Sequence, residues 1–128
     1  MNKNIRFIYL ALLLLTVSFY SCDPDDPGLG GESSVSGKVV HHDDPIPNAL
    51  VFIKFGAKEF PGSDSTVYDL SVIADQNGDY SITGLKKGDY YLYGTGFDAA
   101  INQAVFGGIP ISLGKKEDLS SDLPVTED

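Results

Sequence analysis

The chain contains a single cysteine, so no disulfide can form within it. Basic residues are also scarce, because nine Lys and Arg stand against eighteen Asp and Glu, for a net charge of −9 over 128 residues. Nucleic-acid phosphates are bound by clustered positive charge, so this shortage argues against a nucleic-acid partner. From Ser33 onward no segment has the 3.6-residue hydrophobic repeat of an amphipathic helix. The length allows one domain, and these patterns predict that it is all-β.

An almost unbroken hydrophobic run extends from Phe7 to Val17, behind a short basic stretch that holds Lys3 and Arg6. The apolar segment Ile5–Tyr20 would form a helix of about 24 Å, which is shorter than the roughly 30 Å hydrocarbon core of a bilayer. A basic start and an apolar middle, followed by small residues, are typical of a secretory signal. Residues 1–21 are therefore predicted to be cleaved, which leaves seven Lys, no Arg and a net charge of −11.

Cys22 lies where the apolar segment ends, directly after the small residue Ser21. This arrangement resembles the lipobox of bacterial lipoproteins, although Phe19 and Tyr20 stand where Leu and a small residue are commoner. In those proteins the cysteine becomes the lipidated first residue of the mature chain. The resemblance implies that palmitate-type acyl chains on Cys22 anchor the protein to a membrane, each buried CH₂ contributing about 0.8 kcal/mol. The alternative is a cysteine that happens to lie beside a cleavage site.

Residues 22–33 are rich in Asp, Pro and Gly and lack apolar periodicity, which predicts a tether. The acidic residues after Cys22 resemble the export signal of surface lipoproteins in one Gram-negative phylum. In enteric bacteria, by contrast, Asp beside the cysteine implies retention at the inner membrane. The expected location is the cell envelope, with the outer membrane favoured and exposure at the surface as a further expectation.

Short β-patterned segments separated by turn residues fill the chain from Ser34 onward. The expected strands are Ser34–His42, Ala49–Phe55, Val67–Ala74, Tyr80–Thr83, Asp89–Gly94, Asn102–Phe106 and Ile109–Leu113, with a last extended piece over Leu119–Val125. Asn77-Gly78 and Gly107-Gly108 are predicted to form turns between strands. About seven strands in one domain over residues 34–126 predict a β-sandwich.

Alternation of apolar and polar residues predicts which side chains face the core. The inward set is Val35, Gly37, Val39, Ala49, Val51, Ile53, Phe55, Leu70, Val72, Tyr80, Ile82, Tyr90, Leu92, Ile109, Ile111 and Leu113, with Leu85 between strands. Both faces of Ala49–Phe55 are apolar, so this strand is predicted to be central in its sheet.

Two stretches carry a family resemblance. Ser36–Val40 followed by Pro45–Val51 looks like the opening of a carboxypeptidase regulatory-like domain. Asp75–Leu92 is similar to that family's most distinctive stretch, which reads Asp-x-x-Gly-x-aromatic, a Gly-Leu turn and then Gly-x-Tyr. The resemblance covers about residues 34–125 and implies a transthyretin-like (prealbumin-like, Ig-like), seven-stranded Greek-key sandwich. It implies little about function, because such modules are grafted onto many proteins.

The most site-like cluster in the sequence is His41-His42-Asp43-Asp44, which offers two imidazoles and two carboxylates. Adjacent residues of a strand point to opposite faces, so the two histidines are not expected to bind one ion together. A solvated strand end is the expectation, and one His acting with a loop Asp is the alternative.

Asp75, Asn77 and Asp79 resemble the start of a calcium loop. An EF-hand needs Gly at its sixth position and Glu at its twelfth, whereas here Gly78 is fourth and Lys86 is twelfth. A hairpin turn is therefore expected, with a weak calcium site as the alternative. No cofactor and no metal are predicted.

No serine lies in a Gly-x-Ser-x-Gly elbow, and Cys22 is assigned to the anchor. Hydroxyisourate hydrolases share the transthyretin fold, but they need site His and Arg residues and a Tyr-Arg-Gly-Ser ending. The chain after the leader has no Arg and ends Val125-Thr126-Glu127-Asp128. The protein is therefore expected not to be an enzyme.

Tyr91 and Tyr93 alternate with inward-facing residues, so both are predicted to lie on the outer face of one strand. Two aromatic rings at this spacing form a platform that could stack on sugar rings or on a partner protein. The alternatives are that a loop or another strand covers them, or that they belong to an ordinary solvated face. The long loop Gly56–Thr66 should expose Phe60, which makes it a second candidate contact.

Together these features predict a lipid-anchored, non-enzymatic β-sandwich that acts as a protein-interaction or accessory module. Its expected partner is another protein of the cell envelope. The alternative is a small carbohydrate-binding module at the cell surface that uses Tyr91 and Tyr93.

Overall fold

The structure is a computed structural model that describes residues 26–128. The predicted signal peptide, Cys22 and the first part of the predicted tether lie outside the described residues. Among the residues that the structure describes, no helix is both long enough and apolar enough to span a bilayer.

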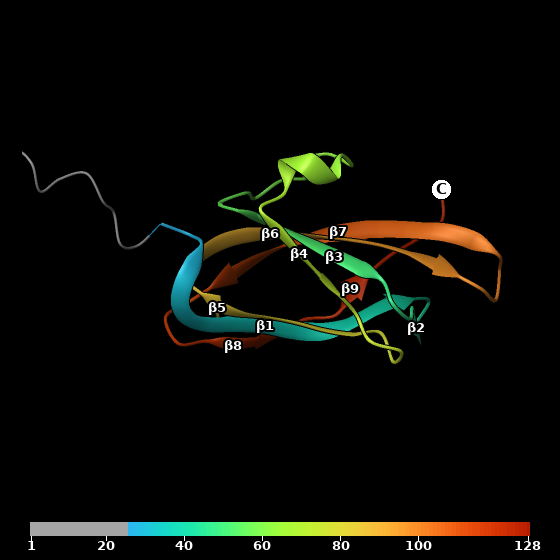
Figure 1. The fold of residues 1–128 in the computed structure, drawn as a ribbon, viewed down its shortest axis with the longest axis horizontal. Helices are drawn as coiled ribbons and strands as arrows, with labels where there is room; N and C mark the ends of the chain where they lie inside the picture. The colour runs from blue at the N-terminus through green and yellow to red at the C-terminus, as the bar shows by residue number, and fades with distance from the viewer. Residues whose placement is uncertain (1–25) are drawn as a thin grey trace, which may run out of the picture.

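Two β-sheets pack face to face and form a sandwich (Figure 1). The strands within residues 26–128 are β1 (Leu29–His41), β2 (Asp44–Pro45), β3 (Leu50–Phe55), β4 (Leu70–Ile73), β5 (Asp79–Leu85), β6 (Gly88–Asp98), β7 (Gln103–Leu113), β8 (Asp118–Ser120) and β9 (Leu123–Pro124), and a short 3₁₀ helix, η2 (Ser65–Val67), precedes β4. One sheet has the order β2-β1-β5, with β8 and β9 also paired to β1, and the other has the order β4-β3-β6-β7. The predicted all-β sandwich is confirmed.

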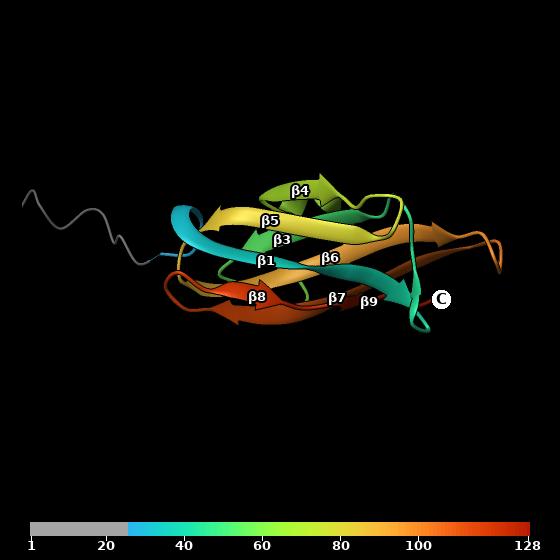
Figure 2. The same cartoon turned by 90° about the horizontal axis from the view of Figure 1, so that it is seen from below.

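The long strand β1 organises the first sheet. It pairs antiparallel with β5 and parallel with β8 and β9, so it lies between β5 and β8 (Figure 2). It begins at Leu29 rather than at the predicted Ser34, and the pairing with β5 shifts register between Leu29 and Val35. The expected start is wrong because Gly30 and Gly31 allow an irregular strand where their composition suggested a tether.

The turn predicted at Gly107-Gly108 is wrong, because β7 runs through both glycines and pairs with β6 along its whole length. A Cβ on Gly107 would overlap the carbonyl oxygen of Pro124, and a Cβ on Gly108 would lie 2.6 Å from the ring of Tyr91. These glycines allow close approach of other chain segments and do not reverse the chain direction.

The core lies between the two sheets and contains the predicted inward residues. The buried members include Val35, Val39, Ala49, Val51, Ile53, Tyr80, Ile82, Leu85, Tyr90, Leu92, Ile111 and Leu113, with Phe55, Leu70, Val72 and Ile109 partly buried. Strand β3 lies between β4 and β6, which confirms the predicted central position. The C-terminal segment also contributes to the core. Strand β9 pairs with β1, and the side chains of Leu123 and Val125 are buried between the sheets.

Candidate functional site

A groove of about 710 Å³ lies on the outer face of β6 and β7. Its lining residues are Phe60, Ser63, Tyr91, Tyr93, Phe106, Gly107, Gly108 and Thr126. Tyr91 and Tyr93 face this groove because Leu92, between them on β6, is fully buried in the core. Phe106 and Thr126 are not among the predicted site residues, because the pattern predicts a strand end at Phe106 and a turn after it.

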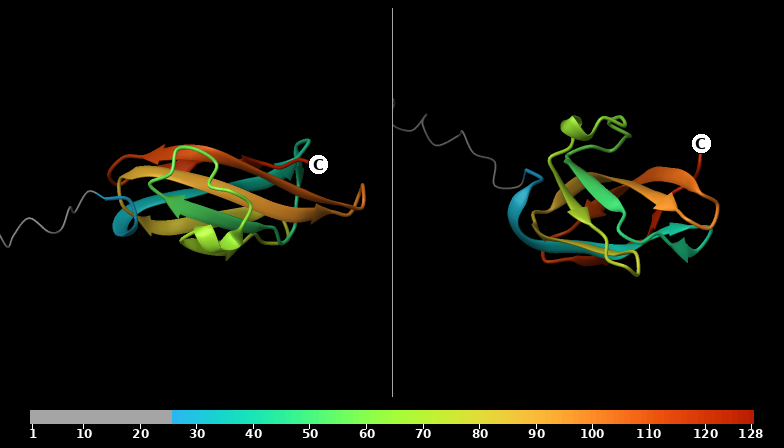
Figure 3. Two further views of the ribbon diagram at one scale, coloured as in Figure 1. Left: turned by 90° about the horizontal axis from the view of Figure 1, so that it is seen from above. Right: turned by 45° about the vertical axis from the view of Figure 1, so that its right-hand side comes forward.

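The loop between β3 and β4 crosses the outer face of this sheet (Figure 3), and its Phe60 packs against both tyrosines. The Phe60 ring centroid lies 6.0 Å from that of Tyr91 and 5.3 Å from that of Tyr93. Tyr91 and Tyr93 are consequently only 8% and 6% exposed, whereas Phe60 is 53% exposed. The expectation of an open platform is wrong, and the alternative of a covering loop is correct. The two candidate contacts predicted separately belong to one site.

Hydrogen bonds and stacking hold this loop in place. The Tyr68 ring stacks on Tyr93 with a centroid distance of 5.7 Å and an interplanar angle of 10°, and its hydroxyl donates to the Gly62 carbonyl at 2.7 Å. Asp64 caps η2 by accepting from the Thr66 amide at 2.9 Å and from the Thr66 hydroxyl at 2.8 Å. These two bonds lower the pKa of the Asp64 carboxyl. The loop therefore holds Phe60 over the groove before any ligand binds.

Burial sets the protonation of the aromatic hydroxyls. It raises the pKa of Tyr68 to about 12, and the neighbouring Tyr93 and Tyr91 hydroxyls add to this effect. Burial is also the main cause that raises the pKa of Tyr91 and of Tyr93. These hydroxyls consequently stay protonated at neutral pH and can donate hydrogen bonds.

Alkaline pH is expected to destabilise the fold through the tyrosines. Burial raises the pKa of all five tyrosines of the described residues. In the unfolded chain a tyrosine ionises near pH 10, whereas folded Tyr68 keeps its proton to about pH 12. Its contribution to stability is present below pH 10 and is lost as the pH rises towards 12. Tyrosinate absorbance should appear at higher pH in the folded protein than in the denatured protein. Tyr68→Phe should remove one of the tyrosines that ionise at high pH. Coincident titration curves would contradict this assignment.

Exposed apolar side chains continue beyond the groove across the same sheet face. Leu50, Ile73, Phe97 and Phe106 are 39%, 69%, 52% and 36% exposed. Leu50 pairs with Ile73 on one side and with Thr95 on the other, and Thr95 pairs with Phe106. These four residues, which we call the apolar strip, therefore lie on one face and span β4 to β7. Such a surface is typical of a contact with another macromolecule.

A second hollow of about 220 Å³ lies where β1 begins. Its lining includes Lys86, Lys87, Lys115 and Lys116, four of the seven lysines that follow the predicted leader. Lys116 lies 3.5 Å from Glu32. The lining of this hollow is therefore mainly basic, although the chain as a whole is acidic.

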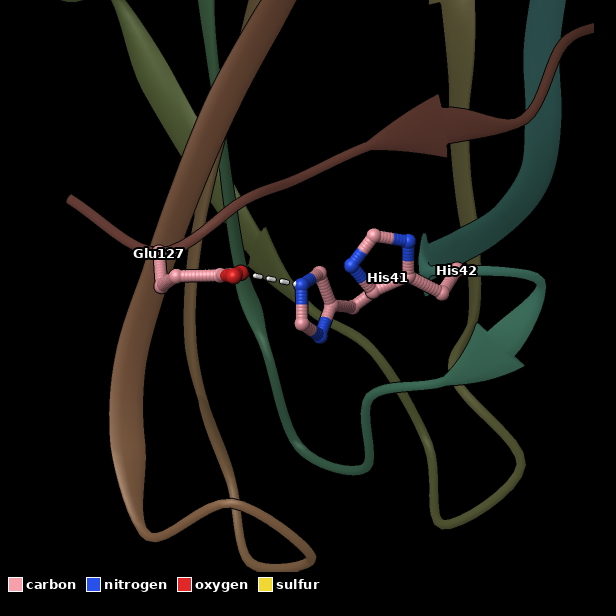
Figure 4. A group of neighbouring side chains, drawn as sticks. All are labelled: His41, His42 and Glu127. Atoms are coloured by element: carbon pink, nitrogen blue, oxygen red, sulfur yellow. Dashed lines mark ion pairs between the residues drawn. The ribbon is translucent and has the colours of Figure 1, made fainter.

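The predicted His cluster is only partly solvated. His41 ends β1 and is 3% exposed, with its Nδ1 atom 2.7 Å from Asp98 Oδ2 and its Nε2 atom against the carboxylate of Glu127 (Figure 4). The hydrogen bond to Asp98 raises the pKa of His41, burial opposes this effect, and Glu127 adds to it. The hydrogen bond from His41 in turn lowers the pKa of Asp98.

His41 and His42 do not point to opposite faces, as strand alternation had predicted. Their ring centroids lie 4.2 Å apart. Alternation stops at His41 because His42 and Asp43 have φ angles of 50° and 68° and form the two-residue turn into β2. A two-residue hairpin requires positive φ at both central residues when it is of type I′, and His and Asp tolerate that region better than most residues.

The Asp75–Asp79 segment forms a turn, as predicted, but not a hairpin, because it links β4 of one sheet to β5 of the other. Asp75 Oδ1 accepts from the amides of Asn77 at 2.8 Å and of Asp79 at 3.0 Å. Asp79 Oδ1 lies 2.7 Å from the Lys38 ammonium. The turn amides and the Lys38 ammonium thus engage both carboxylates, which favours a plain turn over the calcium alternative.

No protein-family model and no curated protein matches the chain. One similar solved structure is a DUF3823 family protein from Parabacteroides merdae, with 20% identity and a TM-score of 0.50 over 77% of this chain and 47% of that one. The chain thus spans about half the length of that protein. Another is a "putative carbohydrate binding protein" from Pseudomonas aeruginosa, with 13% identity and a TM-score of 0.55 over 76% and 90% of the two chains. At such identities the likeness concerns the fold, and by its fold this chain is a β-sandwich protein similar to both.

Proposed function

We propose that the protein binds a glycan in the groove on the outer face of β6 and β7. The observation that carries this proposal is the aromatic lining of the groove, in which Phe60 and Phe106 are exposed while Tyr91 and Tyr93 are largely buried. Aromatic rings stack on the apolar faces of sugar rings, and the exposed rings of Phe60 and Phe106 are available for this contact. The shared fold with the Pseudomonas aeruginosa protein supports the same reading.

The size and charge of the groove favour a short, neutral glycan segment. Its volume of about 710 Å³ falls within the range of roughly 300–1,000 Å³ that is usual for small-molecule sites. Its lining contains hydroxyls at Ser63 and Thr126 and no charged side chain. An acidic sugar would lose hydration there without gaining an ionic partner. We therefore infer a neutral ligand that is bound and not cleaved.

We further propose that the domain, with its carboxypeptidase regulatory-like sequence pattern, is attached to the cell envelope through a lipid on Cys22. Cys22 precedes Asp26, the first described residue, by four positions, so the anchor can extend at most about 14 Å from that residue. Lys86 and Lys87 lie at this end, where they would face lipid phosphates. The groove lies on a sheet face and stays accessible in that arrangement.

Replacing Phe60 by alanine is expected to weaken glycan binding at least tenfold, because the ring supplies one wall of the groove and stacks on the ligand. Its half-exposed side chain lies outside the core, so the unfolding midpoint should change little. The measurement is a glycan array followed by calorimetric titration of the strongest neutral ligand. Phe97→Ala is the matched control, because Phe97 is 52% exposed and does not line the groove.

Two outcomes would contradict a glycan site in this groove. One is that the protein binds no neutral glycan on the array, even at millimolar concentration. The other is a ligand that binds equally to wild type, Phe60→Ala and Phe97→Ala.

A second candidate function is docking of another envelope protein on the apolar strip. The observation that favours it is the exposure of Leu50, Ile73 and Phe97 on one sheet face. The same pair of variants separates the two functions. A protein partner on the strip would be lost from detergent extracts with Phe97→Ala and kept with Phe60→Ala, whereas glycan binding should show the reverse.

A further inference from the structure

Three potential metal ligands converge where β1 ends. His41 belongs to β1, His42 to the turn that follows, and Glu127 to the C-terminal segment after β9 (Figure 4). One ligand atom from each, a ring nitrogen or a carboxylate oxygen, lies within 4.8 Å of the other two. The two histidines are neighbours in the sequence and Glu127 lies far from them along the chain, so only the folded sandwich brings all three together.

The Nε2 atom of His41 is the most unusual atom of this group. His41 is 3% exposed, and among the described residues Nε2 has no hydrogen-bond partner. The Glu127 carboxylate is close enough to Nε2 for an ion pair, but that pair needs a protonated His41, because a neutral Nε2 without its proton would face the carboxylate with a lone pair. A buried polar atom of this kind is rare and needs an explanation.

We propose that His41, His42 and Glu127 form a binding site for a divalent transition-metal ion such as Zn²⁺. Two imidazole nitrogens and one carboxylate oxygen are a ligand set that zinc accepts, with water completing the tetrahedron. The ion would lie between Nε2 of His41 and the Glu127 carboxylate and would satisfy both. Nitrogen ligands favour zinc, copper or nickel over calcium and magnesium, which prefer oxygen.

Asp98 prepares His41 for this role. Its carboxylate accepts the Nδ1 proton at 2.7 Å, so the lone pair of His41 is directed through Nε2 towards the cluster. A histidine ligand that donates its other ring N–H to a carboxylate is the usual arrangement around protein metal ions. Asp98 and Glu127 also supply two negative charges, which balance one divalent cation when both imidazoles are neutral.

Only a small movement is needed to close the site. Tetrahedral zinc with ligands at about 2.0–2.1 Å places neighbouring ligand atoms about 3.3 Å apart. His41 is fixed in the core, whereas His42 is exposed and Glu127 is partly exposed, so these two side chains can make the adjustment. A bound ion would connect the C-terminal segment to β1.

Titration of the chelator-treated protein with Zn²⁺ should show about one ion per chain and should raise the unfolding midpoint by several degrees. Co²⁺ should give the intense visible absorption of a tetrahedral nitrogen–oxygen site. His42→Asn should weaken Zn²⁺ binding at least tenfold, because it removes an imidazole while asparagine tolerates the positive φ of this turn. Glu127→Gln should weaken binding in the same way.

The matched control is Asp43→Asn, which changes the neighbouring turn residue and leaves the three ligands intact. It should bind Zn²⁺ as tightly as wild type. The unfolding midpoint of metal-free His42→Asn, compared with that of wild type, shows whether this variant is folded. Glu127→Gln tests the loss of Zn²⁺ binding independently. Absence of binding to wild type, or equal binding by wild type and both ligand variants, would overturn the proposal.

Discussion

Replacing Gly37 by valine is expected to lower the free energy of unfolding by at least about 3 kcal/mol, a large part of the roughly 5–15 kcal/mol available to a domain. The segment between β8 and β9 runs alongside β1, and its backbone comes very close to β1 at this glycine. A Cβ there would overlap the carbonyl of Ser121 and would lie 3.0 Å from the amide of Asp122. The obstacle is backbone, so rotation of a side chain cannot relieve it.

Hydrogen bonds to β1 hold this segment on both sides of Gly37, so it cannot easily move away. The Ser121 amide donates to the Ser36 carbonyl at 2.7 Å, and the Lys38 amide donates to Asp122 Oδ1 at 2.9 Å. Displacing this segment would break these bonds and would pull Leu123 out of the core. The expected loss therefore combines overlap, lost hydrogen bonds and lost apolar burial.

Urea unfolding followed by circular dichroism measures this effect, since the chain has no tryptophan. Ser81→Val is the matched control, because Ser81 is an exposed residue of β5 opposite Ser36. A β-branched residue at that position should change stability by no more than about 0.5 kcal/mol. A Gly37→Val midpoint equal to that of wild type would show that the Ser121 backbone does not lie against Gly37.

Replacing Cys22 by serine is expected to abolish fatty-acid incorporation and to release the chain from the membrane fraction. Serine cannot form the thioether and acyl attachments that the lipobox resemblance implies for Cys22. Two or more acyl chains at about 0.8 kcal/mol per buried CH₂ give stable anchoring, so the change in membrane partition should be close to complete.

Metabolic labelling with a fatty-acid analogue and fractionation of the cells provide the measurements. Phe60→Ala is the matched control, because it changes the proposed glycan site and should label and fractionate like wild type. The released Cys22→Ser protein should keep its glycan affinity. Labelling that persists in Cys22→Ser would refute the anchor without affecting the proposal for the groove.

Much of the fold could be predicted because the two sheets follow simple alternation. Strands such as β3 and β6 place every second side chain in the core, and this period of two is visible in the sequence. Alternation failed at Gly107 and Gly108, because glycine is common both in turns and where a second segment comes close. Only the position of Pro124 and of the Tyr91 ring distinguishes these two uses.

The candidate sites were less predictable, because each combines segments that are distant in the chain. The outward direction of Tyr91 and Tyr93 followed from alternation, but the loop that carries Phe60 over them depends on packing. Phe106 and Thr126 reach the groove through the pairing of β7 with β6 and through a bridge to the C-terminal segment. No local pattern marks such a combination.

The sequence by itself determined the composition of the core and the turn at Asp75–Asp79. It also determined the resemblance of Cys22 to a lipobox cysteine and of the domain to a carboxypeptidase regulatory-like domain. All of these depend on neighbouring residues and on local periodicity. Only the tertiary structure brought Phe60 over the tyrosines, Ser121 against Gly37 and Glu127 beside His41. The physical reason is that these contacts form when the two sheets and the C-terminal segment close around the core. Their partners are selected by packing in three dimensions and not by spacing along the chain.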